Sequence, residues 1–182
     1  MVYRNQFDKT GQCSEDGHKA EKTFEDLARD RGYLPRKATR SENMFKHVDY
    51  FLTAKSKSGK KVEIKVDVKA RKKTSRRDAK YNDDWQWIEF KNVQGKTGWV
   101  HGDADFIVFE RVDDFIFVNR KELVSWLGGC KKIRYDLPFV NLAKLAKYKI
   151  YQRRGRRDEI TQIKTEDILN LESAKIWKKV DG

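Results

Sequence analysis

A strict alternation of apolar and charged residues from Lys61 to Arg71 is the feature that most constrains the fold. The apolar residues are Val62, Ile64, Val66 and Val68, and the charged ones between them are Glu63, Lys65, Asp67 and Lys69. Because strand side chains point alternately to the two faces, this pattern predicts a half-buried strand. A second alternating run covers Lys46 to Ala54, and the polar stretch Lys55 to Lys60 contains Gly59, which can adopt a positive φ. The two runs predict an antiparallel hairpin.

Other segments carry weaker versions of these signals. A helix is predicted from about Gly17 to Arg31, and the basic stretch Lys72 to Asp84 is predicted to be an irregular loop. Further strands are expected at 85–92, 104–110 and 114–119, a short helix at 120–127, strands at 148–154 and 158–164, and a helix at 164–171 capped by Thr165. The order predicts one α/β (α+β) domain over residues 1–182, with a central sheet flanked by helices and a basic C-terminal hairpin extension from about 131.

The excess of basic residues indicates which class of binding partner to expect. Lys and Arg number 41 against 28 Asp and Glu, a formal net charge of +13, which favours a polyanion such as nucleic acid or an anionic membrane face. No apolar run approaches the ~20 residues of a membrane-spanning helix, and the first sixteen residues lack the apolar core of a signal peptide. The two cysteines, Cys13 and Cys130, have no metal-binding spacing. The expected setting is therefore the cytoplasm, without a membrane partner.

An acidic residue two positions before a lysine has little value by itself. Roughly four such pairs are expected by chance in a chain of this composition. Four are present: Glu63/Lys65, Asp67/Lys69, Asp78/Lys80 and Glu89/Lys91. Geometry has to choose among them.

The hairpin singles out the pair Asp67/Lys69. Opposed residues in an antiparallel hairpin have indices that sum to a constant, and Asp49 and Asp67 are symmetric about the Lys55 to Lys60 turn. This register predicts two adjacent carboxylates, with Lys69 on the same face. Carboxylates that close repel each other unless a cation neutralises them, and Mg²⁺ accepts such a site of carboxylates and waters.

A helix acid, a strand aspartate and a D-x-K triplet in this order resemble the PD-(D/E)XK nuclease superfamily. Archaeal Holliday-junction resolvases are the most similar pattern, with a general likeness to small phage-encoded endonucleases. The segments that carry the resemblance are Gly17-His-Lys-Ala-Glu21, Arg31-Gly-Tyr33, His47-Val-Asp49 and Asp67-Val-Lys-Ala-Arg-Lys-Lys73. Two positions depart from the family pattern: Val48 replaces the proline of the first motif, and Asp67 stands where glutamate is more usual.

The resemblance implies a restriction-endonuclease-like fold and a hydrolytic site that uses Mg²⁺ or Mn²⁺. Asp49, Asp67 and the Val68 carbonyl would hold the ion, which polarises the scissile phosphate and lowers the pKa of a bound water. Lys69 would orient that water or stabilise the developing negative charge. Glu21 matches the helix acid that completes the site, and Glu25 competes for this role.

Two other interpretations remain open at this level. Asp49, Asp67 and Lys69 could be a solvated strand face on which opposite charges merely balance. The motif could instead be shifted, with Asp67 as the first acid and Glu89-x-Lys91 as the catalytic triplet. A non-catalytic basic module that binds nucleic acid on the same fold is the alternative function.

Basic residues bracket the predicted site. Two clusters are predicted to contact DNA: Arg71, Lys72, Lys73, Arg76 and Arg77 after the second strand, and Arg153, Arg154, Arg156 and Arg157 near a hairpin tip. Plain solvated surface is the competing reading of both. The histidines His18, His47 and His101 look too scattered for a site, and Trp85, Trp87 and Trp99 are expected to pack in the core rather than to stack on bases. DNA, with branched or structured DNA as a candidate substrate, is the predicted partner, and a homodimer is a candidate assembly.

Overall fold

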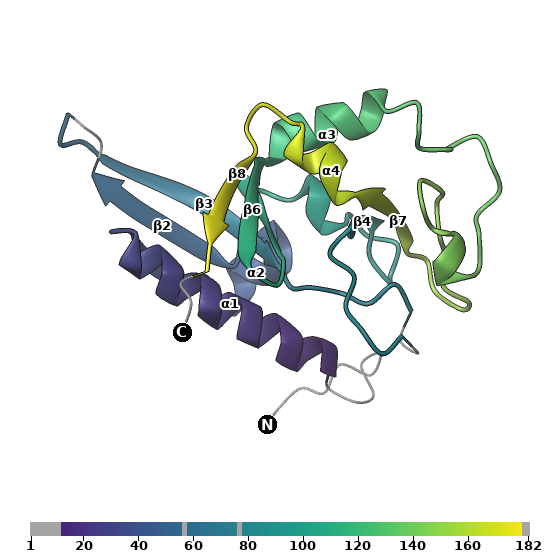
Figure 1. Ribbon diagram of the computed structural model, residues 1–182, viewed down its shortest axis with the longest axis horizontal. Helices are drawn as coiled ribbons and strands as arrows, with labels where there is room; N and C mark the ends of the chain where they lie inside the picture. The colour runs from purple at the N-terminus through teal and green to yellow at the C-terminus, as the bar shows by residue number, and fades with distance from the viewer. Residues whose placement is uncertain (1–11, 56–57, 76–77, 180–182) are drawn as a thin grey trace.

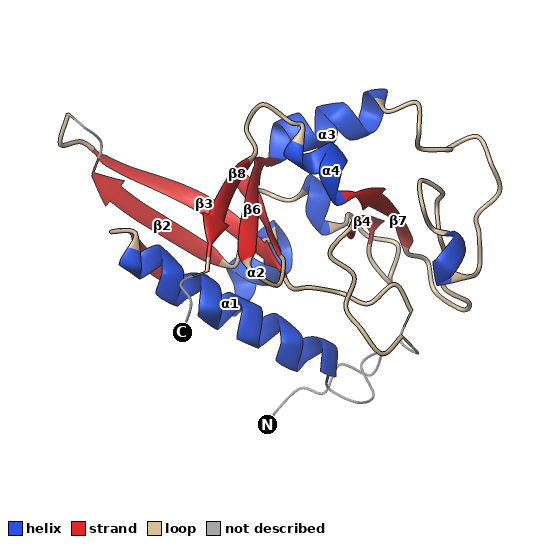
Figure 2. Ribbon diagram, viewed as in Figure 1, coloured by secondary structure: helices blue, strands red, loops and turns tan. Residues whose placement is uncertain are grey.

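The computed structural model describes residues 12–55, 58–75 and 78–179, which form a mixed α/β structure (Figures 1 and 2). A six-stranded sheet has the order β1-β2-β3-β5-β6-β8, and a two-stranded sheet pairs β4 with β7. The strands are β1 (Leu34–Lys37), β2 (Tyr50–Lys55), β3 (Lys61–Lys69), β4 (Trp85–Lys91), β5 (Phe106–Glu110), β6 (Asp114–Asn119), β7 (Glu159–Lys164) and β8 (Lys175–Lys178). The helices are α1 (Gln12–Asp30), α2 (Arg40–Lys46), α3 (Arg120–Gly129) and α4 (Thr165–Leu169), with 3₁₀ turns η1 (Trp99–His101) and η2 (Ala143–Leu145).

The predicted hairpin is present with the predicted register. β2 and β3 are antiparallel from Tyr50 opposite Val66 to Lys55 opposite Lys61, and Gly59 in the turn has a φ of 78°. Extending this register by one residue places Asp49 opposite Asp67. β3 pairs on its other side with β5, in parallel, so that Asp67 and Lys69 lie in the interior of the sheet rather than at its edge.

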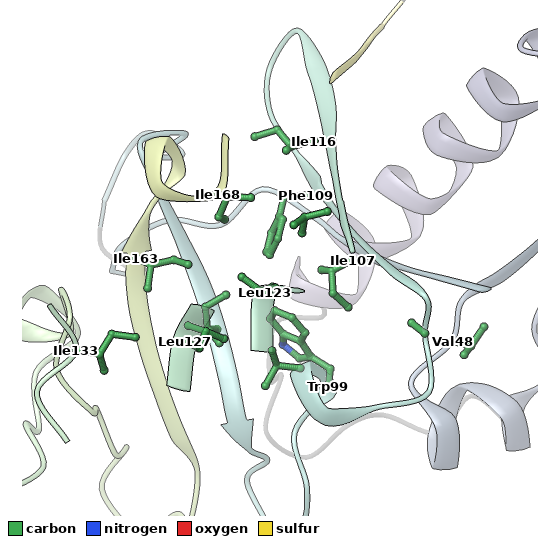
Figure 3. Packing of buried hydrophobic residues seen from close by; sticks show 14 of the residues in the cluster. Val48, Trp99, Ile107, Phe109, Ile116, Leu123, Leu127, Ile133, Ile163 and Ile168 are labelled. Carbon is green, nitrogen blue, oxygen red and sulfur yellow. The ribbon is translucent and has the colours of Figure 1, made fainter. Parts of the chain in front are cut away.

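The two faces of the large sheet bury different apolar clusters. α1 runs along one face, beneath the β2–β3 hairpin in Figure 1, and its buried Phe24 and Ala28 belong to the cluster that contains Val66 and Val68. Since successive strand residues point to opposite faces, Asp67 and Lys69 point away from α1. Their neighbours Ile107 and Phe109 on β5 belong to the second cluster, which continues through Trp99 and Leu123 towards β7 (Figure 3).

The segment before β2 differs from its predicted structure. The alternating run was expected to extend as a strand back to Lys46, whereas residues 40–46 form α2, which ends at His47 in the left-handed conformation, with a φ of 51°. The reason is local, because Thr39 and Glu42 form a reciprocal capping box in which each side chain bonds the other residue's backbone N–H. Four alternating residues therefore favour a strand less strongly than the complete capping box favours a helix here.

The C-terminal third contributes to both sheets. The segment from 131 to 182, predicted as a hairpin extension, supplies β7 to the small sheet and β8 to the edge of the large one. Residues 148–154 do not form the expected strand, although Tyr151 and Ile160 exchange two backbone hydrogen bonds. Thr165 is not the N-cap of α4: Lys164 is, and the Thr165 hydroxyl donates to the carbonyl of Asp83. Within the described residues, no helix is both long and apolar enough to cross a membrane.

Candidate active site

Asp49 lies one residue before β2, where its backbone leaves the ladder. Its N–H donates to the Val66 carbonyl at 2.8 Å, and its carbonyl accepts from Ala38 at 2.7 Å. Its carboxylate takes the place of a ladder acceptor, because Oδ2 accepts the Val68 N–H at 2.7 Å. The Asn43 side-chain amide donates to the other carboxylate oxygen, Oδ1. The side chain is therefore fixed on both oxygens and 6% exposed.

Asp67 is a buried carboxylate with only one of its oxygens satisfied. It is 2% exposed, and Oδ1 pairs with the Lys69 ammonium at 2.6 Å. No donor from the described residues reaches Oδ2. Burial raises the pKa of Asp67 well above its usual value, the neighbouring Asp49 carboxylate raises it further, and Lys69 opposes both effects. A proton or a metal cation at Oδ2 would compensate for the burial of this oxygen.

Lys69 joins the acids to the second apolar cluster. Its side chain is 26% exposed, and its Nζ lies over the Trp99 ring, 4.8 Å from the ring centroid. Burial disfavours the ammonium, but Asp67 and Asp49 outweigh that effect and raise the pKa of Lys69. The side chain therefore acts as a fixed positive charge and a hydrogen-bond donor at neutral pH, and not as a base.

Three residues near this centre were not predicted to belong to it. Asn43 reaches Asp49 from α2, and Trp99 on η1 forms the surface beneath the Lys69 ammonium. His47 is close enough that, after burial, the charge of Lys69 is the next contribution lowering its pKa. The sequence contains one usable signal, the spacing His47-Val-Asp49. Asn43 and Trp99 come together only through the tertiary fold.

The helix acids pair with residues outside this centre. Glu21 pairs with Lys37 of β1 at 2.8 Å. Glu25 pairs with Arg29 at 2.7 Å and accepts from the Tyr50 hydroxyl. α1 covers the face of the sheet opposite to the one that carries Asp67, so the structure does not bring the predicted helix acid to the two aspartates.

The shifted motif is split by the structure. The charge of Lys69 lowers the pKa of Glu89, although burial, the larger effect, raises it. Lys91 instead pairs with Glu159 of β7 at 2.7 Å, after a register shift in β4. Glu89 therefore adds an acid beside Lys69, whereas Lys91 belongs to another part of the surface.

The basic segment after β3 is partly neutralised by its own neighbours. Arg71 pairs with Asp83 at 2.7 Å and lies over the Tyr81 ring, which Lys73 also approaches. Lys72 is half-buried and directly follows Arg71. Arg76 and Arg77 lie outside the described residues.

The second basic cluster has one member near the centre. Arg153 pairs with the buried Asp158 and also lowers the pKa of Glu89 by its charge. The turn beyond it is closed by a bond from the Arg156 N–H to the Arg153 carbonyl, with Gly155 at a φ of 70°. Arg154 and Arg157 are exposed and Arg156 is half-buried. This turn places positive charge on the Glu89 side of the centre.

The donor set fits a divalent ion that keeps most of its water. In the part of the chain that the structure describes, no three His, Cys, Asp or Glu side chains gather as a ready metal cage. The centre does contain two adjacent carboxylates, one with an oxygen that has no donor, and Mg²⁺ is commonly held by one or two carboxylates plus waters. Val68 already contributes its N–H to Asp49, and a ligand role for its carbonyl stays a prediction.

Comparison of the chain with known family models, with curated proteins and with solved structures found no match.

Proposed function

We propose that this protein is a divalent-metal-dependent endonuclease that hydrolyses phosphodiester bonds in DNA, with branched or structured DNA as its candidate substrate. The observation that carries the proposal is the buried Oδ2 of Asp67, to which no described residue donates a hydrogen bond, beside Asp49 and within two residues of a protonated lysine. A merely solvated strand face would leave these carboxylates in water, whereas Asp67 is buried.

Each residue of the centre has a chemical role under this proposal. Asp67 and Asp49 would hold Mg²⁺ or Mn²⁺, which when bound polarises a phosphate and lowers the pKa of a water ligand. Lys69 retains its proton, so it would donate to the attacking water or to a phosphate oxygen and stabilise the charge that develops there. Asn43 fixes the orientation of Asp49, and Trp99 limits where the Lys69 ammonium can lie.

The rest of the molecule is compatible with a DNA substrate. The formal net charge is +13. Phosphates would be contacted by the exposed Arg154 and Arg157, and by Lys72 and Lys73 in the segment after β3. A central mixed sheet with α1 on one face supports the restriction-endonuclease-like arrangement that the sequence resemblance implies. The proposal includes a cytoplasmic setting, that of the host if a phage encodes the chain, and a homodimer as the candidate assembly.

A cleavage assay tests this function. Supercoiled plasmid, single-stranded DNA and a four-way junction are incubated with the wild type in Mg²⁺ or in EDTA, and with Asp67→Asn in Mg²⁺. We expect cleavage by the wild type in Mg²⁺ alone, and a loss of about 100-fold or more in Asp67→Asn because the ion loses a ligand. Asp113→Asn, at an exposed position, is the matched control and should cleave like the wild type.

The alternative function has a distinct outcome in the same assay. Tight, salt-dependent binding of DNA without cleavage of any of the three substrates would support a non-catalytic module and reject the nuclease. Cleavage that persists in Asp67→Asn would reject the proposed centre.

A further inference from the structure

A pocket separate from Asp49, Asp67 and Lys69 lies beside β4 and η1. It is a pocket of about 670 Å³ between β4, η1, α3 and the irregular chain around 135–150. Three aromatic side chains, Phe90, Tyr135 and Phe139, border it, and Val124 and Leu127 of α3 supply aliphatic wall. Its volume is in the range of pockets that bind small organic ligands, which is roughly 300–1,000 Å³. Size and lining therefore suit a flat, largely apolar group.

Two of the three aromatic side chains are half exposed, whereas Phe90 also packs against the core. Tyr135 is 50% exposed and Phe139 is 49% exposed. The Tyr135 ring is fixed at both ends, because its centroid lies 5.9 Å from that of Phe90 and its hydroxyl donates to the Leu127 carbonyl at 3.2 Å. Exposing this much aromatic surface costs free energy that stacking on a planar ligand would recover.

The polar groups at this pocket are few and varied. Lys91 and Glu159 form their ion pair at its edge, and the His101 imidazole lies against the Phe90 ring, with 6.2 Å between the ring centroids. An ammonium, a carboxylate and an imidazole together offer both donors and acceptors. The edge of a heterocyclic base also presents both donors and acceptors, so it can bond to these groups, which a hydrocarbon ligand cannot do.

The pocket shares its wall with the acidic centre. On η1, Trp99 lies under the Lys69 ammonium while His101 lines the pocket, two residues further along. On β4, Glu89 is within electrostatic reach of Lys69 while the next residue, Phe90, lines the pocket. One short segment of β4 and one of η1 therefore border both the pocket and the surroundings of Lys69.

We propose that this pocket binds a single unpaired nucleobase of the substrate strand, against the aromatic rings and with its edge at Glu159 and His101. The inference builds on the proposed function and names its substrate class: DNA in which at least one base is unstacked, as in single strands, junctions and flipped nucleotides. Stacking of one base on an aromatic side chain contributes about 1–3 kcal/mol, a factor of roughly 5 to 150 in affinity.

Direct binding of mononucleotides tests the pocket without needing catalysis. The full chain is titrated in EDTA with dAMP, dTMP and deoxyribose 5-phosphate, and binding is followed by NMR or calorimetry. We expect both nucleotides to bind and the base-free sugar phosphate to bind at least about fivefold more weakly. Phe139→Ala should weaken nucleotide binding by a similar factor, because this exposed ring is lost without a cavity in the core. Val112→Ala, which is also exposed but lies outside the pocket lining, should change nothing.

Each contrary outcome is decisive. Equal binding of deoxyribose phosphate and dAMP would mean that phosphate alone is recognised, and unchanged binding in Phe139→Ala would place the base elsewhere; either result overturns the proposal, as does absence of nucleotide binding. Cleavage of DNA by a protein that fails this titration would leave the proposed function standing. Nucleotide binding by a protein that cleaves no DNA would keep the pocket and reject the nuclease.

Discussion

Replacement of Asp67 by asparagine is expected to raise the free energy of unfolding by about 1–3 kcal/mol near neutral pH while it abolishes DNA cleavage. Asparagine has the shape of the protonated acid, and the raised pKa of Asp67 means that folding disfavours its charged form relative to the unfolded chain, chiefly because the side chain is buried. Its amide also provides donors in place of the oxygen that has none. Chemical denaturation of the wild type, Asp67→Asn and the exposed control Asp113→Asn measures the effect.

The pH dependence of this gain has a definite sign. Because the folded pKa of Asp67 lies above its unfolded value, the folded state binds more protons between the two values, and wild-type stability falls as pH rises through that window. The advantage of Asp67→Asn should therefore be largest above the folded pKa of Asp67 and become smallest below about pH 3, where Asp67 is protonated in both the folded and the unfolded wild type. A variant that is less stable than the wild type at all pH values would contradict the assigned state of Asp67.

Replacement of Lys69 by methionine is expected to have the opposite effect on stability and the same effect on activity. Methionine preserves most of the unbranched side chain but lacks the ammonium that lies over Trp99, so it leaves two buried carboxylates without their cation. Removal of one partner of a buried pair costs about 3–5 kcal/mol, and partial exposure of Lys69 puts the expected loss near the lower end. Cleavage should fall by about 100-fold or more, because the donor to the reacting groups is lost.

A double-mutant cycle separates this effect from a general packing defect. In Asp67→Asn/Lys69→Met, no buried charge remains unpaired at position 67, so most of the lost stability should return although activity does not. Lys91→Met is the matched control for stability, since its partner Glu159 lies in an exposed pair worth about 1 kcal/mol or less. If the two single changes are additive in the double variant, Asp67 and Lys69 are not coupled in the way that the contact at 2.6 Å implies.

The part of this centre that could be predicted from sequence is the part that local rules determine. Alternation fixes which side chains share a face, and symmetry about a short turn fixes which residues face each other, so the juxtaposition of Asp49, Asp67 and Lys69 followed from the hairpin. The same rules failed at the start of this strand, which was expected at Lys46 but begins at Tyr50, because a capping box makes residues 40–46 the helix α2. That error concealed Asn43, which reaches Asp49 only because α2 ends where it does.

Features that depend on distant packing were beyond prediction. Glu21 was predicted as a site residue from its spacing on the helix. Spacing does not indicate which face of the sheet a helix covers, and Glu21 pairs with Lys37 instead. Trp99 was expected to be a core residue and is buried, yet its ring also supports Lys69. The charge of Arg153 acts on Glu89 because β4 pairs with β7. Neither strand contains a local sequence pattern that predicts this pairing.

Binding of a divalent ion is the property on which the account depends most. Isothermal titration of Mn²⁺ into the wild type and into Asp67→Asn measures metal binding without DNA. The titration is done at about pH 8, where protons compete least with the metal for the Asp67 carboxylate. We expect one saturable Mn²⁺ site in the wild type and a loss of Mn²⁺ affinity of about 100-fold in Asp67→Asn, as when a metal ligand or its close support is removed. Equal Mn²⁺ affinity in the two proteins, or no saturable binding to the wild type, would contradict it.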